Sequence, residues 1–303
     1  LHLLKNLRKF NLIINSFYPT SQLDKISSYE KFFQKSILNL SSILDNLPKK
    51  KINKIIYSSS ASIYNSLNDN IYLDKKNRLL YANTKIAVES LIKNYCSKYK
   101  IKFSIARIFN MYGVNDKFSI INKLINSYKK KKKIFINNNG NSIRDFINVE
   151  DVAKVYIKLL KEKKNRIFDL GLGHGIQINE IINNLGKKNF KIKKTSISEQ
   201  QSSIAKLNLI KVKYIKLEDY LINKLNLKKK IILKKVHNSE RNIANDFIQK
   251  TIIYGAGNAG KQVYSAFKKN NYNQMLVSEI MNFLNSHEVK LDKNFSVIVN
   301  QGP

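Results

Sequence analysis

The chain of 303 residues is poor in several residue types, and each scarcity limits what the protein can be. A single cysteine, Cys96, excludes an internal disulfide, so a reducing, cytoplasmic setting is expected. No apolar run reaches the roughly 18 residues that a membrane helix needs. The four histidines and the cysteine are not spaced like metal ligands, so no metal site is expected.

Arginine is also scarce, although the formal net charge is +34. Lysine supplies nearly all of this charge, and lysine, isoleucine and asparagine are abundant together, a combination typical of AT-rich codon use. Proteins that recognise nucleic acids concentrate charge on one face and favour arginine. We therefore expect no specific nucleic-acid partner, only non-specific binding to anionic polymers at low salt. The densest run, Lys129–Lys133, is interpreted as a solvated helix end and turn.

Strand-like and helix-like segments alternate along the chain, which favours an α/β fold with helices on both faces of a parallel sheet. Short apolar runs predict strands at 11–16, 54–58, 103–108, 134–136, 167–170 and 251–254. Apolar residues at helical spacing predict helices over 29–44, 81–99, 118–128, 150–161, 176–185 and 216–226. The rest of 187–230 is expected to be irregular.

Polar residues that can carry chemistry follow the predicted strand at 54–58 and open the next predicted helix. Tyr81 and Lys85 are four residues apart, so on a helix they share one face. A nearby ammonium favours the phenolate, and we expect Lys85 to lower the Tyr81 pKa from about 10 toward neutrality. Such a tyrosine can act as a general base or acid on a hydroxyl, and Ser60 would hydrogen-bond the same hydroxyl. In a chain with 16 tyrosines this spacing alone is weak evidence.

The order of the motifs makes the pattern specific. The serine run and the Tyr81–Lys85 pair are followed by RIFNMYG at 107–113 and by RDFINVEDVA at 144–153. From about residue 11 to about residue 227, the chain resembles the extended short-chain dehydrogenases, in particular the NAD-dependent epimerase/dehydratase family that includes UDP-glucose 4-epimerase. A structural ion pair is the alternative role for Arg107 and Asp145.

The resemblance implies a reaction of NAD with a nucleotide-diphosphate sugar. Tyr81 would remove a hydroxyl proton as hydride passes to NAD, while Lys85 would hold the nicotinamide ribose and Ser60 would orient the hydroxyl. An epimerase returns the hydride to the other face of the keto sugar, whereas a dehydratase first eliminates water. Dehydratases are expected to carry an acidic residue after the catalytic serine or threonine. Ala61 stands there, which favours an epimerase; a dehydratase or reductase is the alternative.

Other matching residues would bind the cofactor or the substrate. Ser58 and Phe109 would adjoin the cofactor, which is expected to be NAD, with NADP left open. Asn110 would lie near the phosphates of the nucleotide sugar, and Arg144 would clamp the diphosphate through paired N–H bonds. The resemblance also allows a homodimer.

One departure from the family concerns the cofactor. The family's sheet begins with a strand and a glycine-rich turn that cradles the NAD pyrophosphate at a helix N-terminus, and no such sequence precedes residue 11. In addition, Ser36 stands where the family usually has asparagine. The sequence therefore predicts a Rossmann-like doubly wound parallel sheet that lacks its first βαβ unit, with a small substrate-binding region. A non-catalytic truncated remnant is the alternative function.

A second glycine motif follows the predicted strand at 251–254. Gly255, Gly257 and Gly260 precede a helix-like stretch and resemble the start of a Rossmann-like unit of polysaccharide-biosynthesis proteins. Because no aspartate follows about 20 residues on, we interpret them as a weak second nucleotide site. We predict a truncated epimerase/dehydratase domain over 1–229, a charged linker over 230–250 and a partial βαβ unit over 251–303. The last is expected to pack separately and leave an open edge at 11–16; a circular permutation that pairs 251–254 beside 11–16 is the alternative.

Overall fold

The computed structural model describes residues 9–15, 23, 25–66, 77–195, 202–206, 210–228 and 230–237, and the strands at 251–254, 275–276 and 297–300. The chain divides into two compact units, each built from separate stretches of sequence. Unit 1 consists of Leu1–Arg107, Ala153–Phe168 and Asn245–Pro303. Unit 2 consists of Ile108–Val152 and Asp169–Ala244.

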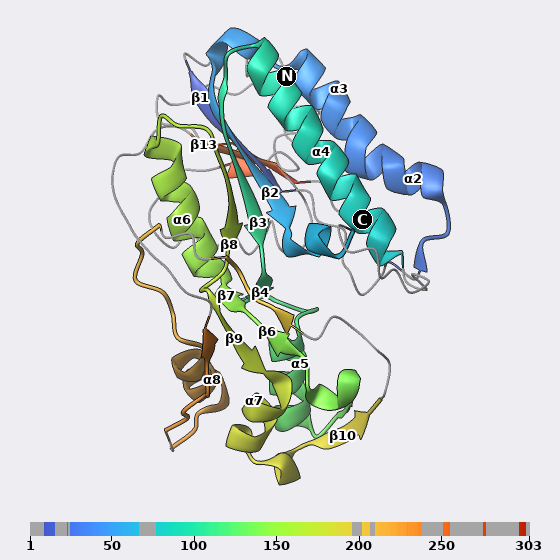
Figure 1. Cartoon of the computed structure of the whole chain (residues 1–303), viewed down its shortest axis with the longest axis vertical. Coiled ribbons are helices and arrows are strands. Elements are labelled where there is room, and N and C mark those ends of the chain that lie inside the picture. Colours follow the sequence, from blue (N-terminus) through green and yellow to red (C-terminus); the bar gives the residue numbers. More distant parts are fainter. Residues whose placement is uncertain are drawn as a thin grey trace. The chain divides into compact units, whose positions relative to one another are not determined.

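Unit 1 is organised around a seven-stranded sheet whose order is β14-β15-β13-β1-β2-β3-β8. Figure 1 labels five of its strands, β13, β1, β2, β3 and β8. Its strands are β1 (Phe10–Asn15), β2 (Ile52–Ser60), β3 (Lys102–Ile108), β8 (Arg166–Leu170), β13 (Thr251–Tyr254), β14 (Met275–Leu276) and β15 (Val297–Asn300). Strand β1 pairs in parallel with β2, β13 and β15. The α/β class and the parallel sheet predicted from the sequence are therefore confirmed.

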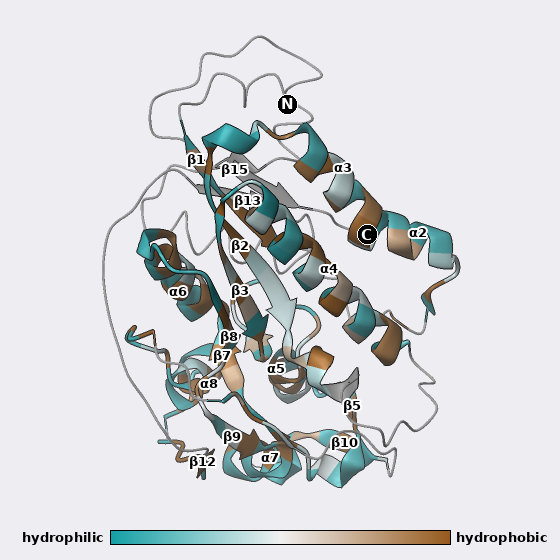
Figure 2. Ribbon diagram, turned by 45° about the horizontal axis from the view of Figure 1, so that its top comes forward, coloured by the Kyte–Doolittle hydropathy of each residue, from teal (hydrophilic) through white to brown (hydrophobic). Residues whose placement is uncertain are grey.

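Helices cover both faces of this sheet because neighbouring residues of β2 point to opposite sides. Ile55 and Tyr57 pack into an apolar core with residues of α3 and α4. On the other side, Lys54 and Ser58 hydrogen-bond to α6. Figure 2 shows mixed hydrophobic and hydrophilic colouring along α3 and α4, as expected for helices with one buried face. The helices of unit 1 are α2 (Tyr29–Phe33), a π-helical turn (Gln34–Leu38), α3 (Asn39–Asn46), α4 (Arg78–Lys98) and α6 (Val149–Lys161), whose first turn belongs to unit 2.

The C-terminal strands correct one prediction about this sheet. We expected residues 251–303 to pack separately and to leave the strand at 11–16 with an open edge. Instead β13 pairs with the first half of β1, in the register Asn11 with Thr251, and β15 pairs with the second half. The physical reason is that β1 is buried along its whole length, so an unpaired edge would leave its backbone groups without hydrogen bonds.

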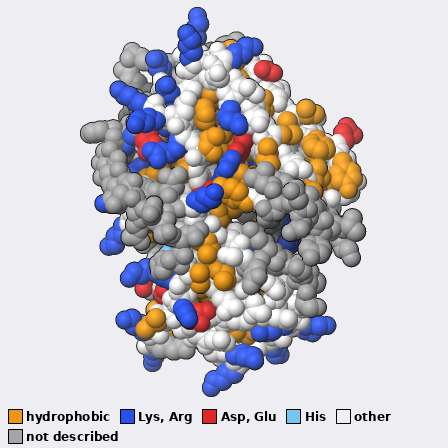
Figure 3. Space-filling view, viewed as in Figure 1, with side chains coloured by type: hydrophobic (Ala, Val, Ile, Leu, Met, Phe, Trp, Pro, Cys, Tyr) orange, Lys and Arg blue, Asp and Glu red, His pale blue; other side chains and the backbone are white. Residues whose placement is uncertain are grey.

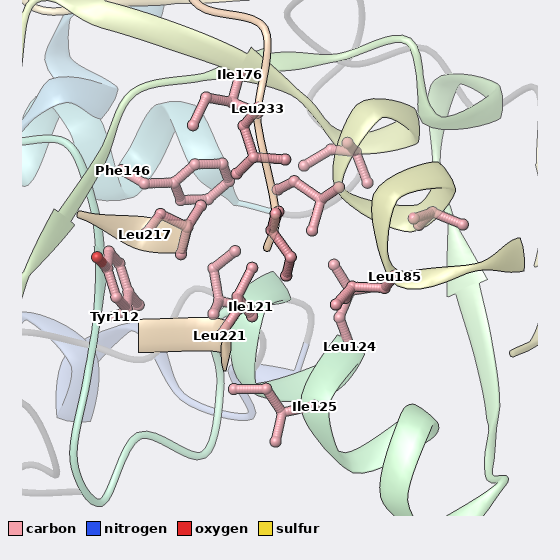
Figure 4. Close-up of a cluster of buried hydrophobic side chains, with 14 of the residues drawn as sticks. Tyr112, Ile121, Leu124, Ile125, Phe146, Ile176, Leu185, Leu217, Leu221 and Leu233 are labelled. Atoms are coloured by element: carbon pink, nitrogen blue, oxygen red, sulfur yellow. The ribbon is translucent and has the colours of Figure 1, made fainter. Parts of the chain in front are cut away.

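Unit 2 contains three small sheets around a second apolar core. Its strands are β4 (Asn110–Tyr112), β5 (Lys133–Ile136), β6 (Ile143–Arg144), β7 (Phe146–Asn148), β9 (His174–Gln177), β10 (Lys191–Lys194), β11 (Ser202–Ser203) and β12 (Val236–His237). Its helices are α5 (Ile120–Lys130), α7 (Ile178–Leu185) and α8 (Leu217–Leu225). Figure 4 shows how these elements supply the core: Phe146 and Ile176 come from strands, and Leu124, Leu185 and Leu221 come from α5, α7 and α8.

Local predictions fail where tertiary pairing overrides sequence pattern. The predicted helix at 176–185 begins only at Ile178, because His174–Gln177 pair as β9 with β6 and β12. The predicted irregular stretch includes β10, which pairs with β5. The lysine run at 129–133 is confirmed as an exposed helix end, because α5 stops at Lys130 and Lys131 adopts the left-handed conformation.

Two further features are the distribution of charge on the surface and the hydropathy of the helices. Figure 3 shows lysine and arginine side chains spread over the visible face, with acidic side chains among them. Within the described ranges, no helix is both long and apolar enough to cross a membrane.

Candidate active site

Three consecutive serines end β2 at the carboxyl edge of the unit 1 sheet. Ser58 is fully buried and donates a hydrogen bond to the side-chain oxygen of Asn15, at the end of β1. Because Ser58 has one hydroxyl hydrogen, the second bond to this hydroxyl, at 2.5 Å, is donated by Tyr156 of α6. Ser58 thus ties together the ends of two strands and one helix.

Helix α4 places Tyr81 and Lys85 beside these serines. Both side chains are buried, with 4% and 3% of their surface exposed. Tyr81 forms a side-chain hydrogen bond with Ser60. The ammonium of Lys85 donates to the backbone oxygen of Ser58 at 3.1 Å and lies 5.7 Å from the centre of the Tyr81 ring. The structure therefore brings together Ser58, Ser60, Tyr81 and Lys85, four of the residues predicted from the sequence.

The electrostatics of this pair differ from our expectation. The pKa of Tyr81 is raised well above its usual value by burial, and the hydrogen bond from Ser60 offsets only part of that rise. Burial also lowers the pKa of Lys85 to about 7, so its positive charge is itself weakened at neutral pH. The predicted lowering of the Tyr81 pKa by Lys85 is wrong for the protein without ligands, because desolvation of both groups outweighs their attraction.

A buried acidic group that we did not predict lies one turn further along α4. Glu89 is 3% exposed and accepts two hydrogen bonds from the guanidinium of Arg107, at 3.1 and 2.9 Å. It also accepts one from Ser59 at 2.6 Å, and Arg107 donates to the Tyr64 hydroxyl. The spacing of Tyr81, Lys85 and Glu89 at successive fourth positions is the sequence signal that could have identified it. Arg107 does form an ion pair, but its partner is Glu89 and not Asp145, the partner that the alternative role assumed.

The remaining predicted binding residues lie in unit 2. Phe109 is buried, and its backbone N–H bonds the Leu170 oxygen. Asn110 donates from both its backbone and its side chain to the backbone oxygen of Asp145, at 3.0 and 3.1 Å. Arg144, the residue before Asp145, donates to the Ile143 oxygen at 2.9 Å. Asn110 of β4 is thus hydrogen-bonded to the residue that follows Arg144 of β6.

Asp145 organises the loops around these two residues. Its fully buried carboxylate accepts backbone N–H bonds from Leu172, Gly173 and Ala205, at 2.8, 2.8 and 3.2 Å. Gly171 makes this approach feasible, because a Cβ there would lie 2.6 Å from a carboxylate oxygen. Burial nevertheless raises the pKa of Asp145 to about 6, and the three backbone bonds only partly oppose the rise.

Buried hydrogen-bonding atoms without partners mark where a ligand could be satisfied. Among the described residues, the side-chain nitrogen of Asn15 and the hydroxyl of Tyr57 have no hydrogen-bond partner. Tyr57 lies 5.1 Å from the Lys85 ammonium, measured to the ring centre, and Asn15 bonds Ser58. Unpaired buried donors are costly unless something supplies acceptors. A polar cofactor such as NAD, rich in hydroxyl, amide and phosphate oxygens, fits this requirement.

The C-terminal glycines, possible metal ligands and Cys96 are the other candidates for a functional role. Gly255, Gly257 and Gly260 lie outside the described residues. Over the described ranges, no group of three or more His, Cys, Asp or Glu side chains is arranged to hold a metal. Burial raises the pKa of Cys96 to about 12, which favours its interpretation as a packing residue.

Known proteins match the part of the chain that carries this site. Residues 3–171 match the family described as the NAD dependent epimerase/dehydratase family. A putative UDP-glucose 4-epimerase of Methanocaldococcus jannaschii is 30% identical over 154 residues, which cover 48% of this chain and 50% of that protein. A dTDP-D-glucose 4,6-dehydratase of Dictyostelium discoideum is 24% identical over 179 residues, which cover 54% and 41%. The chain thus spans about half the length of these relatives or less.

Solved structures show the same fold. A UDP-N-acetylglucosamine 4-epimerase from Methanobrevibacter ruminantium, in complex with UDP-N-acetylmuramic acid, superposes with a TM-score of 0.55 at 24% identity, covering 68% of this chain and 71% of that one. MoeE5 in complex with UDP-glucuronic acid and NAD gives a TM-score of 0.54 at 19% identity, covering 66% and 73%.

Proposed function

Because the chain belongs to the NAD dependent epimerase/dehydratase family, we propose that it is an NAD-dependent nucleotide-sugar epimerase. The observation that carries the proposal is the cluster of half-buried Ser60 with buried Tyr81 and Lys85. In this cluster the Tyr81 hydroxyl bonds Ser60, and the Lys85 ammonium donates to the Ser58 backbone oxygen. The similarity to a putative UDP-glucose 4-epimerase and to a dTDP-D-glucose 4,6-dehydratase supports a nucleotide-diphosphate sugar as the substrate. Ala61 after Ser60 favours epimerisation over dehydration.

Each residue of the cluster has a distinct task in this proposal. Ser60 orients a sugar hydroxyl by hydrogen bonding, and Tyr81 accepts the proton of that hydroxyl and later returns it. NAD, when bound, supplies the hydride acceptor. Protonated Lys85 favours the Tyr81 phenolate and binds ribose hydroxyls. Since Tyr81 is protonated in the free protein, its activation depends on how far ligand binding restores a positive charge beside it.

Further residues are proposed to bind the substrate phosphates and the cofactor. Asn110 and Arg144 are proposed to bind the diphosphate of the sugar nucleotide, and Arg144 suits this task because a guanidinium pairs with phosphate oxygens. Ser58, Phe109 and Lys85 are proposed to adjoin the cofactor, with NAD favoured over NADP.

The C-terminal strand gives the second glycine motif a role in this proposal. Strand β13 pairs in parallel with β1, as β2 does, so β13 ends at the same edge of the sheet as β2, whose last residue is Ser60. Gly255, Gly257 and Gly260 follow Tyr254 directly in the sequence. We propose that this motif contributes the pyrophosphate site, which favours the circular-permutation alternative.

Two measurements test the function. Tyr81→Phe, assayed with NAD and UDP-glucose, is expected to fold normally and to lower turnover by about 100-fold or more. Unchanged turnover would remove Tyr81 from the mechanism. Titration of the chain with NAD is expected to show binding that Gly257→Val weakens at least about tenfold; equal affinity in the variant would exclude the C-terminal motif as the pyrophosphate site.

A further inference from the structure

A buried ion pair lies next to the proposed catalytic cluster but takes no part in the proposed chemistry. Glu89 is on α4, the helix of Tyr81 and Lys85, and accepts from Arg107 at the end of β3 and from Ser59 in β2. Its two carboxylate oxygens accept three hydrogen bonds from side chains of two strands. Burying a carboxylate is costly, and this partner set offsets that cost.

The contact with Ser59 links Glu89 to the catalytic serine. Ser59 precedes Ser60, whose hydroxyl accepts bonds from the backbone and side chain of Ser62 at 3.2 and 2.9 Å and bonds Tyr81. A strand end that shifts by less than an ångström would lose the last of these bonds. The Ser59–Glu89 bond of 2.6 Å joins that strand end to the helix that carries Tyr81.

Glu89 also acts on Lys85 through its charge, since the two residues are four positions apart on α4. The rings of Tyr57 and Tyr81 lie 5.1 and 5.7 Å from the Lys85 ammonium. Beyond these groups, Arg107 of β3 pairs with Glu89, and Tyr156 of α6 acts on Tyr57. Of these groups, Glu89 is the one that opposes the effect of burial on Lys85, because its negative charge raises the pKa of the ammonium. Loss of this charge would therefore leave Lys85 less protonated.

We propose that Glu89 is a positioning residue of the site, which fixes the Ser60 end of β2 against α4 through Ser59 and keeps a negative charge facing Lys85. This inference rests on the proposed function, since a positioning role for Glu89 requires that Ser60 and Lys85 take part in the reaction. If the ion pair only stabilised the fold, its removal would also lower the stability of the protein. It would leave the titration of Lys85 and the local rigidity of the serine run unchanged.

The first experiment measures the titration of Lys85 in the ligand-free chain. Side-chain NMR of ¹³C-lysine-labelled protein follows Lys85, whose signal is identified by its loss in Lys85→Arg. Glu89→Gln is expected to lower the Lys85 pKa by about one unit, as expected for loss of a nearby opposite charge. The matched control is Glu162→Gln, which removes the partly exposed ion pair of 2.9 Å with Arg166 and is expected to leave the pKa of Lys85 unchanged.

The second experiment remains informative if Glu89→Gln does not fold. Ser59→Ala keeps the ion pair but removes the link to β2, and is expected to accelerate amide hydrogen exchange over residues 60–62 by about tenfold or more. Its matched control is Ser104→Ala, which removes a buried hydroxyl on β3 without a described partner. A Lys85 titration equal in Glu89→Gln and wild type, or equal exchange in the two serine variants, would overturn the proposal. Neither readout depends on turnover, so these failures are distinguishable from the failure of the proposed function.

Discussion

Glu89 in unit 1 and Asp145 in unit 2 are both buried carboxylates, and their partners are of different kinds. Glu89 accepts from side chains, namely the guanidinium of Arg107 and the hydroxyl of Ser59. Asp145 accepts from the backbone N–H groups of Leu172, Gly173 and Ala205. The buried charge of Glu89 is compensated by an opposite charge, and that of Asp145 is compensated by peptide dipoles.

The difference has a measurable consequence. Dipoles compensate the Asp145 charge only in part, so burial raises its pKa to about 6. On the other side of the comparison, the bond to Glu89 is the main cause that raises the pKa of Arg107 above its usual range. Asp145 fixes loops through their backbone, so its hydrogen bonds involve no side chain of the donor residues. Gly171 leaves room for its carboxylate. Glu89 depends on the identity of its partners.

The largest expected effect is loss of the Asp145 carboxylate. Asp145→Ala leaves three buried backbone N–H groups without an acceptor, and each costs about 1–3 kcal/mol. We expect the free energy of unfolding to fall by about 4 kcal/mol in total, measured by urea denaturation. Asp219→Ala, at an exposed position in the first turn of α8, is the control and should cost less than about 1 kcal/mol. Equal losses would show that the Asp145 bonds contribute nothing specific.

Lys85 makes unit 1 sensitive to alkaline pH. Its pKa in the folded protein is about 7, below the ordinary value of 10.5. Between these values the unfolded chain holds a proton that the folded protein lacks, so this group makes stability rise with pH. Lys85→Met has no such titrating group. The difference in unfolding free energy between Lys85→Met and wild type should therefore decrease by on the order of 3 kcal/mol from pH 7 to pH 10, as wild type becomes more stable. A difference that does not change with pH would contradict the lowered pKa.

Asp145 makes unit 2 sensitive in the opposite direction, at acidic pH. Its pKa is raised from 3.8 to about 6, so between these values the folded protein holds a proton that the unfolded chain lacks. Its contribution to stability is therefore present below pH 4 and is lost as the pH rises through 6. The advantage of wild type over Asp145→Asn should decrease by on the order of 2 kcal/mol over that range. An advantage that grows with pH would mean that the backbone dipoles outweigh burial.

The sequence predicted the fold where local pattern and tertiary demand agree. Strands at 54–58 and 103–108 and the helix at 81–99 are apolar at the spacing that the sheet requires, and they form within a few residues of the predicted positions. The edge of β1 was mispredicted because pairing with β13 joins residues far apart in sequence. No periodicity reports such a long-range pairing.

For the candidate site, the order of the motifs in the sequence predicted that Ser58, Ser60, Tyr81 and Lys85 lie together. The reason is that the end of a strand and the start of the next helix are adjacent in a βα unit. Their protonation could not be predicted, since desolvation depends on how completely other elements cover the pair. Glu89 was missed although its spacing was visible, because a glutamate on a helix is usually solvated and its partners lie on two other strands.

The smallest effect separates a partnered buried hydroxyl from an unpartnered one. Ser59→Ala removes one of the donors to Glu89 while Arg107 continues to neutralise the charge. A hydrogen bond to a charged group contributes about 1.5–3 kcal/mol, and the remaining partners should limit the loss to about 1.5 kcal/mol. Ser104→Ala removes a buried hydroxyl that has no partner among the described residues, so its loss relieves desolvation and should leave stability unchanged or raise it by up to about 1 kcal/mol. Urea denaturation of both variants measures the difference. If Ser59→Ala is as stable as Ser104→Ala, Arg107 alone satisfies Glu89, and the contrast between side-chain and backbone partners reduces to a single ion pair.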